Sequence, residues 1–95
     1  MDEDHRRLKR QWKQAQRDTA RETFPLPEVE LVSMFNAVGA AVQRDGCDHT
    51  LRATTVWLAQ RAEAPAVVSW LAENGGYCDC EVVANTADHF EQNRS

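Results

Sequence analysis

Several features common in enzymes, secreted proteins and membrane proteins are missing from this sequence. It has no apolar run of about 18 residues, so no helix of it can span a membrane. It has no Walker loop, GxGxxG, GxSxG or HExxH motif, so the usual enzyme signatures give no candidate. Cysteine occurs three times, and an odd number leaves one thiol over in any disulfide scheme. We therefore expect a protein that is not an enzyme and has no small-molecule substrate.

The N-terminus, MDEDHRRLKRQWKQ, has neither the apolar segment nor the small-residue cleavage site of a secretory signal. We therefore expect a cytoplasmic location, where thiols stay reduced and can bind metal. A chain of 95 residues forms one small domain with a modest core, so a bound metal ion would be a useful addition to its stability.

The charge is distributed unevenly along the chain. Residues 1–24 carry seven Lys/Arg and five acids, net +2, whereas residues 25–95 carry four bases and ten acids, net −6. The region from His5 to Arg17 has six bases and no acid. This local excess predicts an acidic partner for the N-terminal segment, and RNA is among the candidates.

Residues 3–22 are predicted to form a long charged helix, because they lack Gly and Pro and are rich in helix-forming residues. An apolar stripe with 4-3-4 spacing runs along it, formed by Leu8, Trp12, Ala15 and Thr19. We interpret residues 1–24 as a basic amphipathic arm, in which Trp12 anchors a partner or stacks on a base. The residues expected to bind that partner are Arg6, Arg7, Arg10, Trp12, Lys13 and Arg17. The alternative is a solvated helix with one contact seam.

Residues 25–95 are predicted to form a small helical domain. The prolines of FPLP end the first helix, and Gly46 closes the second. Helices are expected over residues 27–45, 50–61 and 65–73, with Thr50 as the N-cap of the middle one. YCDCEVVA has the pattern of a strand or hairpin, and NTADHFEQ that of a last helical turn. The expected fold is mainly α, with a short strand at a zinc site: a long charged helix followed by a compact three-helix, zinc-stapled domain.

Four metal-ligand side chains occur as two pairs with the same one-residue spacing. Cys47 and His49 lie in GCDHT, and Cys78 and Cys80 lie in GGYCDCEV. In an extended segment residues i and i+2 point to the same side, so each pair could hold one ion. Three cysteines and one histidine are the donor set of a structural zinc site, so we predict that these four residues bind zinc. Three acids are expected to form hydrogen bonds around His49, namely Asp48, Asp79 and Glu81.

Two other interpretations of the cysteines stay open. Cys78 and Cys80 could form a redox pair in a thiol–disulfide protein, although so short a disulfide loop would be strained. The three thiols could also be buried small apolar side chains, with His49 satisfied by the backbone. A zinc site closed by four protein ligands leaves no position for water or substrate, which favours a binding protein over a hydrolytic enzyme.

Three segments resemble the signature of a small bacterial family catalogued as a domain of unknown function: CDHT, a helix with WL, and NGGYCDCEVVAN. Within that family the chain is similar to the actinobacterial, mycobacterial-type recruitment factor for the ribosome hibernation factor, which is implicated in zinc-starvation responses. The resemblance implies a Cys-His-Cys-Cys motif at Cys47, His49, Cys78 and Cys80.

The resemblance further implies a zinc-responsive adaptor that brings a hibernation-factor protein to the small ribosomal subunit when zinc is scarce. The basic segment fits such a role, because ribosome surfaces are dense in phosphate and it could contact rRNA. The remaining alternative is a zinc-stapled oligomerisation or docking module, in which Leu8, Trp12 and Ala15 would form a contact between chains.

Overall fold

The computed structural model describes residues 2–94, which form helices and turns without a β-strand. In chain order the helices are α1 (Asp2–Glu22), α2 (Glu28–Asp45), α3 (Arg52–Leu58), α4 (Ala64–Glu73), α5 (Asp79–Glu81), the π-helix η1 (Val82–Thr86) and α6 (Ala87–Asn93). The last three follow one another without a break and are called here the α5–α6 rod. The prediction of a mainly α fold is confirmed. Within residues 2–94 no helix combines the length and the apolar character that a membrane crossing requires.

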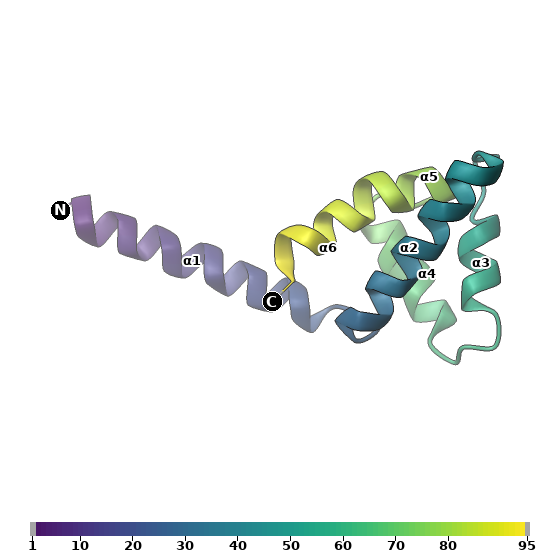
Figure 1. Cartoon of the computed structure of the whole chain (residues 1–95). Coiled ribbons are helices and arrows are strands. Elements are labelled where there is room, and N and C mark those ends of the chain that lie inside the picture. The colour runs from purple at the N-terminus through teal and green to yellow at the C-terminus, as the bar shows by residue number, and fades with distance from the viewer. Residues whose placement is uncertain (1, 95) are drawn as a thin grey trace.

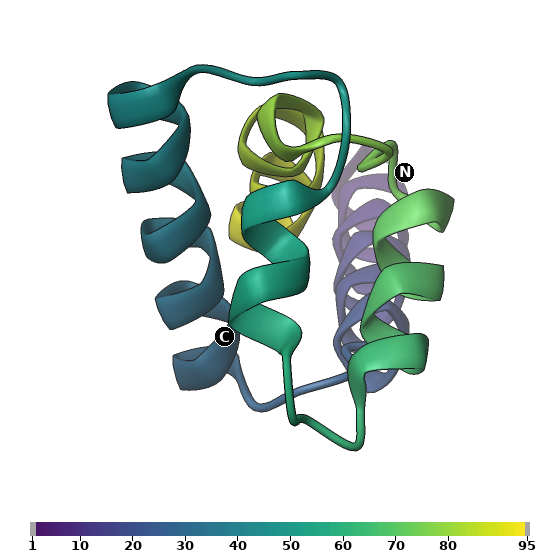
Figure 2. The same ribbon diagram turned by 90° about the vertical axis from the view of Figure 1, so that its right-hand side faces the viewer.

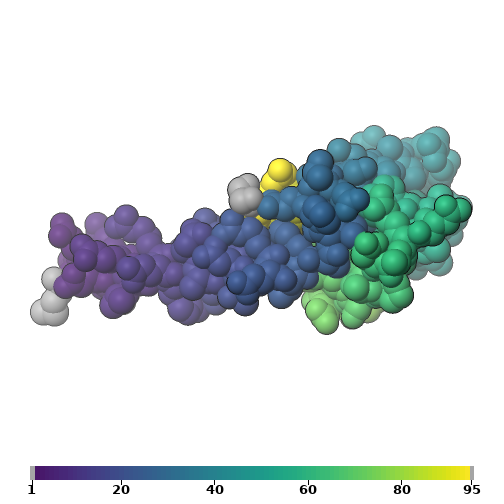
Figure 3. Space-filling view, turned by 90° about the horizontal axis from the view of Figure 1, so that it is seen from below, coloured from purple at the N-terminus to yellow at the C-terminus, as the bar shows by residue number. Residues whose placement is uncertain are grey.

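The body of the molecule consists of α2, α3, α4 and the α5–α6 rod. Figure 2 shows α2, α3 and α4 standing side by side with the rod behind them, seen nearly end on. Helix α1 leaves this body as an arm and contacts it through α6 (Figure 1). The principal extents are 54 × 26 × 20 Å, and the long direction is that of the arm, which projects as a single helix (Figure 3).

The core fills the space between α2, α3, α4 and the rod, because each presents one apolar face to the others. Its buried side chains are Leu26, Leu31, Met34, Val38, Leu58, Val67, Trp70, Leu71, Val82 and Phe90. Phe24, just beyond the end of α1, lies with its ring centroid 5.7 Å from that of Trp70 and 5.3 Å from that of Phe90. This aromatic contact anchors the base of the arm, whereas α1 itself contributes no buried residue.

The strand predicted for YCDCEVVA is wrong, because the segment turns helical after its second residue. Cys78 is extended, with φ −145° and ψ 168°, and α5 begins at the next residue, Asp79. The N–H of Val82 then donates to the carbonyl oxygen of Cys78 at 2.9 Å. Val82 is fully buried, and burial of this helical face overrides the β propensity of the two valines.

The prediction of Thr50 as a helix N-cap is also wrong. Helix α3 begins two residues later, at Arg52, and it ends at Leu58 rather than near Arg61. The residue at its N-cap position is Leu51, which has no side-chain acceptor. The first N–H groups of α3 therefore depend on an acceptor from elsewhere in the chain.

The Asn74-Gly75-Gly76 turn ends α4 as predicted and also supports the rod. Gly75 has a φ of 78°, which favours glycine, and its carbonyl accepts a hydrogen bond from the Asn85 side chain at 3.1 Å. A Cβ on Gly76 would lie 2.5 Å from Thr86 Oγ1 and 3.2 Å from the carbonyl oxygen of Leu71. The turn and the π-helix η1 therefore fit together only while residue 76 has no side chain.

Candidate metal centre

Three cysteine side chains from two distant parts of the chain meet at one end of the body. Cys47 lies in the loop between α2 and α3, Cys78 directly before α5, and Cys80 within α5. Their sulfur atoms all lie within 4.8 Å of one another, and those of Cys78 and Cys80 are 3.3 Å apart. A tetrahedral zinc ion with Zn–S bonds of about 2.3 Å holds its sulfurs about 3.8 Å apart. The three sulfurs therefore have the spacing that a metal ion of this size needs.

Backbone hydrogen bonds bring the two cysteine-bearing segments together. Gly46 ends α2 with a φ of 75° and turns the chain into the loop that carries Cys47. The N–H of Asp79 donates to the carbonyl oxygen of Thr50 at 2.9 Å, and the N–H of Cys80 donates to the Cys47 sulfur at 3.3 Å. The cluster is therefore held by main-chain contacts of residues 47–50 with residues 79–80, in addition to the thiols.

Asp79, between the two cysteines of the CDC triplet, caps helix α3. Its carboxylate is only 3% exposed and accepts hydrogen bonds from the N–H groups of Ala53 and Thr54, at 2.9 and 3.1 Å. The Thr54 hydroxyl donates to it at 2.8 Å. These bonds supply the acceptors that α3 lacks at its own N-terminus and place a negative charge at the positive end of the helix. The carboxylate of Asp79 therefore serves α3, not His49 as the sequence analysis expected.

His49 stands apart from the sulfur cluster. Within residues 2–94, the group of ligand atoms that could hold a metal ion consists of the three cysteines alone. His49 is exposed and has a φ of 66°, a left-handed conformation that is uncommon for residues other than glycine. Asp48 accepts hydrogen bonds from the N–H and hydroxyl of Thr50, and so shapes the loop. The structure brings three of the four predicted ligands together, and the fourth stays a prediction.

The environment shifts the pKa values of Cys47 and Cys80 in opposite directions. The backbone N–H of Cys80, followed by that of His49, lowers the pKa of Cys47, because both stabilise its thiolate. Hydrogen bonding to Cys78, followed by that to Cys47, raises the pKa of Cys80 to about 12. A hydrogen bond from the Thr50 hydroxyl lowers the pKa of Asp48. Thiols this close cannot all ionise without a cation between them, and a bound metal ion would remove that conflict.

The residues predicted to bind a partner lie on α1, away from the cysteine cluster. All six are exposed, and Trp12 is 61% exposed. The structure therefore separates the chain into a possible metal site on the body and a charged arm at its other end (Figure 1).

Comparisons with known proteins agree with the signature that the sequence carries. The family described as "Protein of unknown function (DUF2695)" matches residues 34–85, which is more than half of the chain and includes all three cysteines. "Uncharacterized protein Rv2271" of Mycobacterium tuberculosis (strain ATCC 25618 / H37Rv) and "Uncharacterized protein Mb2294" of Mycobacterium bovis are each 33% identical over 79 residues. Each alignment covers 82% of this chain and 80% of the relative. No solved structure matches. The chain thus belongs to the DUF2695 family of proteins of unknown function.

Proposed function

We propose that this protein is a non-enzymatic zinc-binding adaptor of the cytoplasm. The observation that carries the proposal is the cluster of three cysteine sulfurs, all within 4.8 Å of one another, gathered from segments more than thirty residues apart. Thiolates are soft ligands that favour zinc over magnesium or calcium. The proposed fourth ligand is His49, which lies two residues from Cys47 in the same loop.

Zinc would fasten the loop after α2 to the start of the α5–α6 rod. Structural zinc ions add their binding free energy to folding, because the ligands are assembled only in the folded chain. In this chain the metal would also secure α3, since Asp79 caps that helix from between two of the cysteines. Loss of zinc would therefore loosen α3 and the start of the rod together, which gives the protein a way to respond to zinc supply.

The proposed role of the adaptor follows from the family resemblance. It would bring a hibernation-factor protein to the small ribosomal subunit, with its zinc state deciding when it does so. The choice of binding over thiol–disulfide catalysis is supported by the third sulfur, because Cys47 lies within 4.8 Å of both Cys78 and Cys80 and a redox pair needs only two cysteines. A redox enzyme would need a reactive, accessible thiolate, and Cys78 is only 5% exposed.

Metal analysis of the full chain, purified without chelator, tests the metal site. We expect about one zinc per chain, and a loss of zinc in the Cys47→Ser and Cys78→Ser variants. Asp48→Asn is the matched control, because it changes the same loop at a residue that is not a proposed ligand. His49→Ala shows whether His49 is the fourth ligand. Zinc affinity should fall in this variant if it is, and should stay unchanged if only the three cysteines bind the ion. Full retention of zinc in both serine variants would overturn the proposal.

Two further measurements test the adaptor role. Co-sedimentation of the hibernation factor with small ribosomal subunits should depend on this protein and on its zinc content. Chelator-treated protein should not reduce a disulfide substrate, and turnover abolished by Cys80→Ser would instead establish the redox alternative.

A docking module for a second copy of the chain has one observation in its favour. Leu8 and Trp12 are 65% and 61% exposed on the arm. Light scattering on the full chain and on Leu8→Ala/Trp12→Ala should give a monomer in both cases if the adaptor proposal holds, whereas a dimer lost in the variant would support the module.

A further inference from the structure

The arm carries cations that the folded chain leaves unpaired. Within residues 2–94, no carboxylate lies within ion-pair distance of the six bases between Arg6 and Arg17. Of the five other bases in the chain, four form ion pairs: Arg21, Arg44, Arg61 and Arg94. The protein thus neutralises most of its other cations and concentrates unpaired positive charge on one projecting helix, which is the electrostatic footprint of a binding site for an anionic polymer.

Four of these bases form a basic stripe along α1, defined as Arg6, Arg10, Lys13 and Arg17, with 4-3-4 spacing. The apolar stripe of Leu8, Trp12, Ala15 and Thr19 has the same spacing. At 3.6 residues per turn the two stripes point in directions roughly 160° apart. They therefore lie on opposite sides of the helix.

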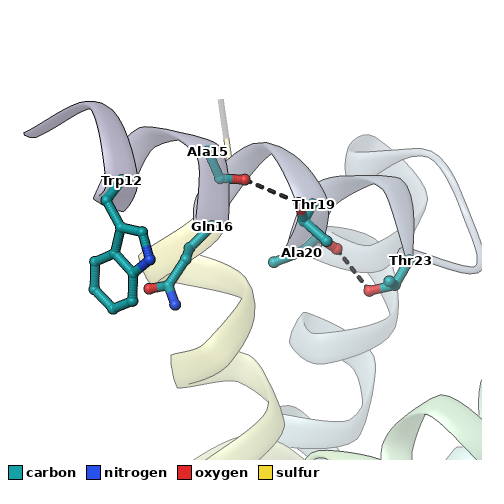
Figure 4. Close-up of a pocket in the computed structure, with 6 residues that line it drawn as sticks. All are labelled: Trp12, Ala15, Gln16, Thr19, Ala20 and Thr23. Carbon is teal, nitrogen blue, oxygen red and sulfur yellow. Dashed lines mark hydrogen bonds between the residues drawn. The ribbon is translucent and has the colours of Figure 1, made fainter. Parts of the chain in front are cut away.

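Trp12 and two cations of the basic stripe line different surface hollows of the arm, which meet at Gln16. Trp12 lines a shallow groove with Ala15, Gln16, Thr19, Ala20 and Thr23 (Figure 4). The hydroxyls of Thr19 and Thr23 donate to the carbonyl oxygens of Ala15 and Ala20, so their polar groups are satisfied within the helix. Lys13 and Arg17 line a different hollow, together with Gln16 and with Gln92 and Asn93 of α6. No cation of the basic stripe lines the groove of Trp12, although Gln16 borders both hollows.

The length of the basic stripe suits a nucleic-acid backbone. From Arg6 to Arg17 the helix rises about 17 Å, at 1.5 Å per residue. One strand of a DNA duplex carries a phosphate about every 3.4 Å along the helix axis, so at that spacing the stripe spans about five phosphates. Long, flexible Arg and Lys side chains on an exposed helix can reach such a row without any change in the body.

We propose that the basic stripe of α1 binds the phosphate backbone of RNA without reading its sequence. The stripe supplies charge but no aromatic side chain that could stack on a base, because Trp12 points to the other side. An anionic membrane surface fits less well, since a helix lying on a membrane buries its apolar face, and this one has only two large apolar side chains, Leu8 and Trp12.

This inference deepens the proposed ribosomal role and rests on it, because the ribosome is where the protein would encounter RNA. RNA binding by the stripe and zinc binding by the body can nevertheless be tested separately. The stripe is remote from the cysteine cluster, so Cys78→Ser should lose zinc and still bind RNA. If the full chain binds zinc but does not bind RNA, the inference is wrong and the proposed metal site is unaffected.

The test measures the fluorescence anisotropy of a labelled oligouridylate as the full chain is added. The oligonucleotide is about 20 nucleotides long, so that it is longer than the stripe, and the titration is repeated at salt concentrations between about 50 and 200 mM. With four phosphate contacts and a slope of about −0.7 per contact on a single strand, affinity should fall about 50-fold over this range. Arg10→Gln/Arg17→Gln should reduce that fall to about 7-fold, because two contacts are lost. Arg44→Gln/Arg52→Gln is the matched control, with the same change in net charge on the body, and should behave as the parent.

The remaining measurements show whether RNA binds the basic stripe or the side of α1 that carries Trp12. Trp12→Ala should leave the RNA affinity and its salt dependence unchanged. The proposal is overturned if the parent shows no salt-dependent binding to RNA. It is also overturned if Arg10→Gln/Arg17→Gln and Arg44→Gln/Arg52→Gln lose RNA affinity equally. Binding to phosphatidylserine vesicles that requires Trp12, without binding to oligouridylate, would overturn it in favour of a membrane. Circular dichroism and zinc content of each variant verify that the fold is retained.

Discussion

Replacing Asp79 by alanine should be among the most destabilising single changes near the cysteine cluster. The substitution leaves two backbone N–H groups, those of Ala53 and Thr54, and the Thr54 hydroxyl without their acceptor. Loss of a helix cap costs about 1–2 kcal/mol, and a buried donor left unsatisfied costs about 1–3 kcal/mol. Asp79 is 3% exposed, so water cannot easily replace the carboxylate.

Together these contributions predict a loss of about 3–4 kcal/mol in the free energy of unfolding. For a domain of this size each kcal/mol lowers Tm by about 4–8 °C, so Tm should fall by at least about 12 °C. Asp79→Asn should lower the free energy of unfolding by about 2 kcal/mol. The amide keeps one oxygen acceptor, but its NH2 group replaces the second and faces a backbone N–H, so two donors point at each other. Zinc affinity should fall in both variants, since the same residue holds α5 against the loop that carries Cys47.

Urea unfolding at a fixed zinc concentration measures these changes, and an unchanged m-value would show that only stability was altered. Asp48→Ala is the matched control, because Asp48 is an exposed carboxylate in the same region and its side chain accepts hydrogen bonds from Thr50, two residues away in the same loop. We expect that control to cost less than about 1 kcal/mol. Equal losses in Asp79→Ala and Asp48→Ala would refute the reasoning that a distant carboxylate caps α3.

Three further substitutions probe the backbone of the body by the same unfolding assay. Gly76→Ala should destabilise the protein by about 2 kcal/mol, because its Cβ would lie 2.5 Å from Thr86 Oγ1 and 3.2 Å from a backbone oxygen; Gly46→Ala, where no atom lies within 4 Å, should show only the cost of its φ of 75°, about 1 kcal/mol. Gln60→Gly should stabilise the protein by about 0.5 kcal/mol, because Gln60 is exposed and has a φ of 73°, and a loss of stability would show that its side chain contributes more than the conformation costs.

The helices that local signals define could be predicted from the sequence. The prolines of FPLP and the glycine at 46 mark the ends of α2, and the 4-3-4 spacing of its apolar residues identifies the face that contains Leu31 and Val38. The end of α4 at the Asn74-Gly75-Gly76 turn is equally local. Each of these features depends on residues within one or two turns of the helix concerned, which is why a single sequence suffices.

The features that failed depend on contacts between distant residues. The segment from Tyr77 to Ala84 alternates in a way that suits a strand, but its helical form buries Val82 and places Asp79 at the N-terminus of α3, where its partners lie 25 and 26 residues earlier. The start of α3 was misplaced for the same reason, because its cap comes from that residue and not from Thr50. The π-helical turn of η1 depends on Asn85 and Thr86, which bond the carbonyls of Gly75 and Asn74.

The cysteine cluster was predicted on an incorrect backbone. Cys78 and Cys80 were expected to share one side of a strand, whereas Cys78 is extended and Cys80 lies in the first turn of a helix. Their sulfurs still meet, at 3.3 Å. The one-residue spacing therefore indicates which sulfurs lie close together, although the strand geometry that would explain it does not occur.

The lack of any buried residue in α1 has a consequence for how tightly the arm can bind. A helix that buries none of its own side chains is only marginally stable in water, so the exposed part of the arm is helical in a fraction of the molecules at any moment. A partner that requires the helical form binds with an apparent Kd equal to the intrinsic Kd divided by that fraction. Affinity can therefore change through helix propensity alone, at exposed positions that touch neither the body nor the partner. Selection can in this way adjust the strength of binding without altering the core or the three cysteines.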